Sequence, residues 1–228
     1  TIGIVPGKLG ENKEEDIKKL SELTGVSIEY INTELSRSYV KDDTFVPIKK
    51  ISKDDNEKKE ALLKIPGIKL TNTSARVYPL GEEAAHLIGY VQKINEQELE
   101  QNKEKGYSSS SVIGKDGLEK AYEDRLRAVD GKEIIIVDEK GNKIKQLAKQ
   151  DKKDGEDIKL TIDSKIQKQL YDSLKNDKGF FVVMNPNTGE LLGAVSTPSY
   201  NSNDFVLGMT QDKWNELNNN EAKPMYNR

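Results

Sequence analysis

Apolar side chains recur at helical spacing in the first third of the chain. Asn12 and Ser27 are typical N-cap residues, and Gly25 between them is a typical helix end. The apolar stripes are formed by Ile17, Leu20 and Leu23, by Ile28, Ile31 and Leu35, and by Ala61, Leu62 and Ile65. This spacing predicts amphipathic helices over residues 13–24, 28–35 and 52–65.

Short runs of apolar and β-branched residues between these segments indicate strands. Pro47 lacks a backbone N–H, so its run is expected to end there or to lie at a sheet edge. The predicted strands cover residues 1–6, 44–48, 68–71, 133–137 and 158–162.

Five further helices are expected in the middle and last parts of the chain. Asn95 with Glu98 three residues later spells a capping box. Glycines end a short helical pattern over residues 81–89, and Asp163 is a good N-cap for the segment that carries Ile166, Leu170 and Leu174. The remaining helical patterns lie at residues 117–126 and, around Trp214, at residues 211–217.

The most apolar stretch is residues 179–196, where two runs flank the turn Asn-Pro-Asn-Thr-Gly at 185–189. This pattern predicts a β-hairpin. The first run is almost continuously apolar, so we expect both of its faces to be covered, as in a central strand. The lysine-rich stretch at 149–157 is the best linker candidate, which divides the chain into domains at 1–155 and 156–228.

Composition favours a polar protein with a large surface. Hydrophobic residues make up 34% and charged residues 33% of the 228 residues, and the mean hydropathy is −0.75. The formal net charge is −3, and Lys and Glu are interspersed without a basic block. Nucleic acid is therefore not an expected partner.

Cysteine is absent, which excludes disulfides, thiol catalysis and thiolate metal sites. No apolar run approaches the roughly 18 residues of a membrane-spanning helix, and no signal peptide is visible. The chain opens on Thr1 and stops at Arg228 without a helix-ending residue. We interpret it as a fragment of a larger protein.

Two residues in the middle of the chain could carry chemistry. His86 is the only histidine and stands among Ala, Leu and Ile, so a packed structural role is favoured over metal binding or base catalysis. Arg76 precedes a rigid Tyr-Pro pair. It could clamp a neighbouring domain or bind an anion, and an ordinary ion pair between elements is the simpler interpretation.

Several ordered segments together carry a family resemblance. They are RVYP at 76–79, AAHLIGYV at 84–91, GKDGLEKAY at 114–122, LTID at 160–163, NPNTGELL at 185–192 and VSTPSY at 195–200. In this order they resemble class B penicillin-binding proteins, from the non-catalytic region to the entry of the transpeptidase domain. The segments DDTFVP at 42–47 and IGK at 113–115 resemble the low-affinity branch of the methicillin-resistance type.

The resemblance implies an α+β fold: an elongated, multi-lobed pedestal of the dimerisation type, followed by the truncated start of a domain like those of transpeptidases and serine β-lactamases. It also implies a parent enzyme that cross-links peptidoglycan stem peptides. In that family a serine of an S-x-x-K motif forms the acyl-enzyme, S-x-N and K-T-G motifs complete the site, and β-lactams acylate the same serine.

The catalytic motifs themselves are not found in this chain. Ser38 and Lys41 spell S-x-x-K, but they lie far upstream of the hairpin, so we interpret the match as chance. Ser199 and Asn201 spell S-x-N, yet they precede the place where the family's nucleophile stands, and K-T-G is absent. We expect no catalytic residue, metal site or cofactor in this fragment.

The resemblance also suggests a regulatory groove for cell-wall fragments in the pedestal. Arg76 and Asp130 match charged positions of that groove, whereas Lys132 stands where an aromatic residue is favoured. This departure leaves ordinary ion pairs as the simpler interpretation of both residues.

Two hypotheses for function follow. The first is a fragment of a D,D-transpeptidase that is held on the extracellular face of the cell membrane by an N-terminal segment absent from this chain. Its partners are stem peptides and β-lactams. The second is a non-enzymatic extracellular scaffold that binds cell-wall glycan or a division partner. In either case the severed hairpin has unpaired edges, so a homo-dimer through this region is an expected partner interaction.

Overall fold

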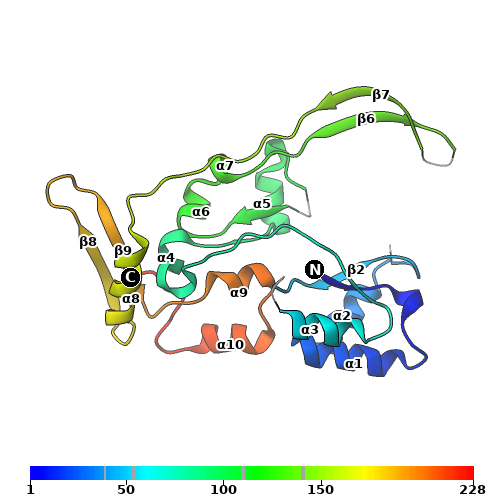
Figure 1. The fold of residues 1–228 in the computed structure, drawn as a ribbon, viewed down its shortest axis with the longest axis horizontal. Coiled ribbons are helices and arrows are strands. Elements are labelled where there is room, and N and C mark those ends of the chain that lie inside the picture. Colours follow the sequence, from blue (N-terminus) through cyan, green and yellow to red (C-terminus); the bar gives the residue numbers. More distant parts are fainter. Residues whose placement is uncertain (39, 53–54, 109–110, 140–141) are drawn as a thin grey trace. The chain divides into compact units, whose positions relative to one another are not determined.

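A computed structural model describes residues 1–38, 40–52, 55–108, 111–139 and 142–228 (Figure 1). The fold is α+β. It divides into two compact units, the first formed by residues 1–82 with 198–228 and the second by residues 83–197. The second unit contains both sides of the boundary expected after residue 155, and that boundary stays a prediction.

The first unit is built on a three-stranded antiparallel sheet. Its central strand β1 (Ile2–Ile4) pairs with β2 (Val46–Lys49) on one side and with β3 (Ile68–Leu70) on the other. Pro47 is exposed on β2, which is an edge strand, and this confirms the position expected from its missing N–H.

Three helices cover this sheet: α1 (Lys13–Thr24), α2 (Ile28–Leu35) and α3 (Asn56–Leu63). Asn12 and Ser27 accept hydrogen bonds from the N–H groups of their third following residues, as expected for N-caps. The buried core contains Ile2, Ile4, Ile17, Leu20, Ile31, Val46, Ile48, Leu62 and Ile65. Most stripe residues expected from sequence therefore lie in this core or pack against it, whereas the expectation for Ile28 is wrong, because its side chain is 43% exposed.

The third helix begins later than predicted. Ser52 precedes the helix, which starts at Asn56 after the N-cap Asp55, whose carboxylate accepts a hydrogen bond from the Lys58 N–H at 3.2 Å. The Asp55 carboxylate thus occupies the N-cap and satisfies one of the free amides of the first turn, three residues after the start expected at Ser52. Asp54, within the range expected to be helical, lies outside the described residues.

The last residues complete the first unit with α9 (Ser202–Leu207) and α10 (Gln211–Asn219). The Asn203 side chain accepts a hydrogen bond from the Tyr78 N–H and donates one to the Tyr78 carbonyl, both at 2.9 Å. The two ends of this unit, 125 residues apart in sequence, are joined by that pairing. The helix expected around Trp214 is confirmed as α10.

The short helix η2 (Gly81–Ala84) spans the boundary between the units, and the second unit continues with α4 (Ala85–Ile88). It then pairs β4 (Val91–Lys93) with β5 (Val112–Gly114). Around this pair lie α5 (Glu96–Gln101), η3 (Lys103–Lys105), α6 (Gly117–Ala121) and α7 (Glu123–Leu126). The single helix expected over 117–126 is wrong. It breaks at Tyr122, whose φ of −114° and ψ of 22° are not helical.

The chain then forms a two-stranded ribbon of β6 (Lys132–Val137) and β7 (Lys143–Gln150) (Figure 1). The linker expected at 149–157 is partly wrong, because β7 runs through Gln150 and Lys153 makes a backbone bridge to Val129. The strand expected at 158–162 is also wrong, since no regular element is assigned there. Its Thr161 hydroxyl instead donates to the Leu191 carbonyl at 2.7 Å.

The hairpin is confirmed as β8 (Gly179–Met184) and β9 (Leu191–Thr197), with α8 (Ser164–Leu174) packed on one face. Ile166 and Leu170 pack closely against Gly193, which has no side chain. The expectation that both faces of β8 are covered is wrong. This sheet has two strands, and its other face exposes Phe180, Val182 and Met184 by 52%, 44% and 54%.

Candidate functional site

The S-x-x-K match at Ser38 and Lys41 lies in an exposed turn after α2. Within the described part of the chain, no hydrogen bond links these two side chains, and the intervening Tyr39 lies outside it. A nucleophilic serine needs a base within hydrogen-bond reach. The geometry therefore supports a chance match.

The S-x-N match at Ser199 and Asn201 is engaged in structural contacts. The Ser199 hydroxyl donates to the Glu82 carbonyl at 2.8 Å, and the Asn201 side chain caps α9 by accepting from the Asn203 N–H at 2.9 Å. Tyr200 between them is buried and packs edge-on against Phe205, with ring centroids 5.4 Å apart. These residues turn the chain from β9 into α9.

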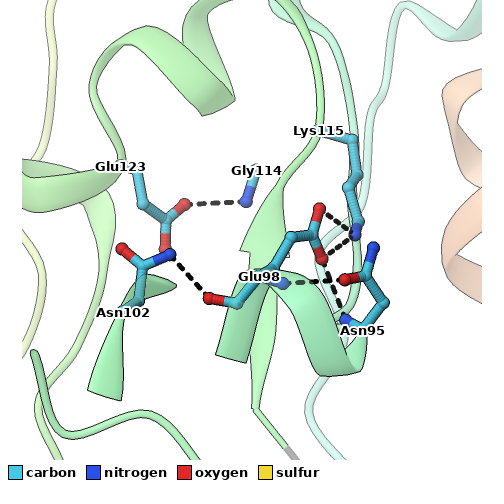
Figure 2. A network of polar contacts seen from close by, with 6 residues as sticks. All are labelled: Asn95, Glu98, Asn102, Gly114, Lys115 and Glu123. Atoms are coloured by element: carbon cyan, nitrogen blue, oxygen red, sulfur yellow. Dashed lines mark hydrogen bonds and ion pairs between the residues drawn. The ribbon is translucent and has the colours of Figure 1, made fainter. Parts of the chain in front are cut away.

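A polar pocket in the second unit brings several charged groups together. Its volume is about 360 Å³, and its walls come from α5, β5, α6 and α7. On one wall, the Lys115 ammonium donates hydrogen bonds to both carboxylate oxygens of Glu98, with N–O distances of 2.6 and 2.5 Å (Figure 2). Glu98 also completes the predicted capping box, accepting from the Asn95 N–H at 2.9 Å.

Glu123 holds the opposite wall. One carboxylate oxygen accepts from the Gly114 N–H at 2.8 Å (Figure 2). The other accepts from the Tyr107 hydroxyl at 2.7 Å. The Arg127 guanidinium lies 3.7 Å from the centre of the Tyr107 ring, close enough for a cation–π contact. The glycine and lysine of the GKDG segment thus each bind a different glutamate, and they fix α5 and α7 to β5.

The electrostatics follow from these contacts. Burial acts to raise the pKa of Glu98, but hydrogen bonds from the Asn95 N–H and from Lys115 outweigh it and hold that pKa below its ordinary value. Burial, together with the Glu123 carboxylate, strongly raises the pKa of the Tyr107 phenol. Both groups therefore keep one protonation state across the neutral range.

The pocket is suited to holding its walls together or recognising a polar ligand, rather than to proton transfer. Its third acid, Asp124, pairs with Lys105 at 2.9 Å, so each pocket carboxylate already has a partner. No group of three or more potential metal ligands occurs among the described residues. Nor does any described helix have the length and apolar character needed to cross a bilayer.

The residues proposed from sequence lie outside this pocket. Arg76 is exposed in the first unit, in an irregular segment after β3, while Asp130 and Lys132 are exposed in the second unit, beside β6. The regulatory groove stays a prediction. His86 is 5% exposed within α4, in keeping with a packed structural residue.

Sequence reasoning missed the pairings of Glu98 with Lys115 and of Glu123 with Gly114. The capping box located Glu98, and the GKDG segment was noted for its resemblance alone. Both pairs join residues from separate elements, so no local spacing signals them.

The family model described as the penicillin-binding protein dimerisation domain matches residues 1–160. The chain belongs to this family. The GKDG segment, whose contacts build the pocket, lies inside the matched region, so the pocket is part of the dimerisation domain.

The curated relatives of this dimerisation-domain chain are class B penicillin-binding proteins. It is 45% identical over 223 residues to penicillin-binding protein 3 of Bacillus subtilis (strain 168), which covers 98% of the chain and 33% of that protein. It is 31% identical over 214 residues to the peptidoglycan D,D-transpeptidase MrdA of Acinetobacter baumannii, covering 94% and 32%. The chain thus spans about a third of the length of these relatives.

Solved structures agree with this assignment. Penicillin-binding protein 2 in its complex with MreC from Helicobacter pylori matches the whole chain with a TM-score of 0.70 and 28% identity, covering 43% of that protein's chain. Pseudomonas aeruginosa PBP2 in complex with WCK 5153 matches 70% of the chain and 32% of its own, with a TM-score of 0.56 and 35% identity. The α+β pedestal expected from sequence is therefore the fold of this family.

Proposed function

We propose that this chain is the pedestal and first hairpin of a cell-wall D,D-transpeptidase. The complete protein binds penicillin and cross-links peptidoglycan stem peptides through an acyl-serine intermediate, and the 228-residue chain itself is inactive. Relatives named peptidoglycan D,D-transpeptidase support the reaction. The acyl-serine step is inferred from the family resemblance.

The uncovered face of β8 carries this proposal. Phe180, Val182 and Met184 share that face and are each about half exposed. Fully burying such a side chain stabilises a protein by roughly 1.5–3 kcal/mol, so a sheet that leaves three of them in water is incomplete. We propose that the remaining strands of the transpeptidase domain pack there and bring the nucleophile.

Acylation by a fluorescent penicillin tests this function. We expect the full-length protein to become covalently labelled and the 228-residue chain to remain unlabelled. A Ser38→Ala variant of the full-length protein is the matched control, and its labelling should equal that of the wild type. Label on Ser38 of the 228-residue chain would overturn the assignment of the active site.

A second candidate is a non-enzymatic scaffold that binds cell-wall glycan or a division partner. It is favoured by one observation: the solved relative from Helicobacter pylori is in complex with another protein, MreC. Absence of penicillin labelling in the full-length protein, and of any S-x-x-K motif in the coding sequence after Arg228, would favour this candidate.

We further propose that the protein belongs to the low-affinity branch and works on the extracellular face of the cell membrane, held by an N-terminal anchor. The segments at 42–47 and 113–115 support the branch, and the peptidoglycan substrate supports the location. Slow acylation by β-lactams relative to a penicillin-sensitive class B protein would support the branch. Labelling of intact cells with an impermeant amine reagent tests the location.

A further inference from the structure

The ribbon of β6 and β7 exposes apolar side chains on both faces. Successive side chains along β6 point to opposite faces of the ribbon, which places Ile134 and Ile136 on one side and Ile135 and Val137 on the other. These four side chains are 40–59% exposed. No described helix of the second unit packs on the ribbon, whose strands contact chiefly each other (Figure 1). A partner would therefore bury apolar area on both faces.

The two outer edges of the ribbon differ. Along β7, Leu147 and Ile144 are extra residues without an opposite partner in β6, so that strand is bulged twice. The six residues of β6 follow one another in the ladder without an insertion. Bulges blunt an edge against further pairing, whereas a regular edge with apolar side chains and no proline accepts another strand. The edge of β6 is thus the open one.

The charges on the ribbon indicate the chemistry of the strand that would pair there. Its strands hold Lys132, Lys143, Lys145 and Lys149 against a single acid, Glu133, which pairs with Lys143. Lys149 pairs with Asp151, directly after β7. These lysines stand at the two ends of the apolar stretch. Two strand spacings, about 10 Å, separate β7 from a strand added at β6, which is the Debye length at about 0.1 M salt. The lysines of β7 therefore act on an added strand at low salt.

We propose that the outer edge of β6 binds an extended strand of a partner protein, with β-branched residues at its centre and acidic residues at both ends. Backbone hydrogen bonds would supply affinity, and the lysines would select an acidic partner. A second copy of this chain fits less well, because pairing two ribbons through β6 would double the excess of lysine in one sheet. This inference deepens the proposed scaffold role of the pedestal.

A synthetic peptide tests the edge directly in the full-length protein. The probe is a fluorescein-labelled peptide with a Val-Thr-Val-Thr core and two glutamates at each end, and binding is followed by fluorescence anisotropy. Peptides with lysine in place of glutamate, or with all four core nitrogens methylated, are the controls. We expect the glutamate peptide to bind at least about tenfold more tightly than either control at low salt.

Protein variants locate the site. Lys145→Glu with Lys149→Glu should weaken binding of the glutamate peptide by about tenfold or more and favour the lysine peptide. The exposed residues Lys93 and Lys178 provide a matched reversal elsewhere in the same unit, Lys93→Glu with Lys178→Glu, which should leave binding unchanged. Penicillin labelling is measured in parallel, so failure of the ribbon proposal is distinguishable from failure of the proposed enzyme.

Three results would overturn the proposal. The first is no binding of the glutamate peptide at millimolar concentration. The second is equal binding of the methylated peptide, which cannot form the backbone ladder. The third is a dimer in sedimentation experiments that dissociates in the Ile134→Lys variant and that the peptide does not disrupt, which would make a second copy the occupant.

Discussion

Gln167 of α8 forms hydrogen bonds with both backbone groups of Ala194 on β9. Its amide oxygen accepts from the Ala194 N–H at 2.8 Å, and its amide nitrogen donates to the Ala194 carbonyl at 2.8 Å and to the Glu83 carbonyl at 2.6 Å. The side chain is fully buried. Gln167 thus satisfies the Ala194 N–H and carbonyl, which a neighbouring strand would otherwise pair with, and it links the hairpin to the segment before α4.

Replacing this glutamine should destabilise the 228-residue chain. Gln167→Leu keeps a similar size but leaves one N–H and two carbonyls without the side chain that they contact. Each unsatisfied buried group costs about 1–3 kcal/mol, so we expect a loss of about 3 kcal/mol or more in the free energy of unfolding. Urea denaturation followed by circular dichroism measures it.

Gln169→Leu is the matched control, because Gln169 lies on the same helix and is exposed. Surface substitutions of this kind usually change stability by less than about 0.5 kcal/mol. Equal losses in the two variants would show that the amide contacts of Gln167 contribute nothing specific.

Two lysine–glutamate pairs in the second unit differ mainly in burial. The side chains of Lys115 and Glu98 are 15% and 27% exposed, whereas those of Lys103 and Glu100 are 63% and 68% exposed. Lys115→Met should cost about 1.5–3 kcal/mol, the range for hydrogen bonds to charged groups, while Lys103→Met should cost less than about 0.5 kcal/mol. Thermal and urea unfolding of both variants test this ranking, which similar losses would contradict.

The local elements of this protein could be read from its sequence because their signals are local. The caps at Asn12, Ser27 and Asp163 mark the starts of α1, α2 and α8, and the hairpin was located by its Gly-ended turn. Each depends on residues within one turn of the chain, so spacing alone is enough.

The errors occur where distant residues decide the outcome. Residues 158–162 have the composition of a strand, yet the Thr161 side chain rather than a backbone ladder bonds to Leu191. The coverage of β8 depends on which elements pack on the hairpin, and among the described residues its sheet contains only β8 and β9. The pairing of Glu98 with Lys115 bridges 17 residues, and nothing in their spacing distinguishes it from many other acid–base pairs in a chain with 33% charged residues.

Acid should selectively weaken the contribution of Glu98. Its pKa is lowered in the folded chain, so its stabilising effect is present above the ordinary glutamate pKa of about 4.3 and is lost as the pH falls through the folded value. The stability difference between wild type and Glu98→Gln should therefore shrink from pH 6 to below pH 4. In a Lys115→Met background this pH dependence should be smaller, and an unchanged dependence would contradict the assigned cause.

Tyr107 should ionise later than an ordinary tyrosine. Burial and the Glu123 carboxylate raise its pKa, while Arg127 acts in the opposite direction. The unfolded chain loses this proton near pH 10, so the stabilising effect is complete below that pH and is lost above it. In a spectrophotometric titration, Tyr107→Phe should remove one late-ionising group. Glu123→Gln should shift that group to lower pH and Arg127→Met to higher pH, and shifts of the same sign would contradict this account.

Gly89 and Gly106 both have a positive φ, of 81° and 73°. Gly106 is in the left-handed helical conformation, whereas the ψ of −153° at Gly89 lies in a region that is essentially restricted to glycine, and the surroundings of the two residues also differ. A Cβ at Gly89 would lie 1.8 Å from the Asp116 carbonyl oxygen, whereas a Cβ at Gly106 would meet nothing within 4 Å. Gly106→Ala should therefore cost only the conformational penalty, about 1–2 kcal/mol. Gly89→Ala must also push apart the backbones of α4 and the GKDG segment, so we expect it to lose cooperative unfolding or to cost more than twice as much as Gly106→Ala. Urea unfolding of the two alanine variants measures both losses in the free energy of unfolding. Equal costs would mean that the close approach of residues 89 and 116 does not constrain this unit.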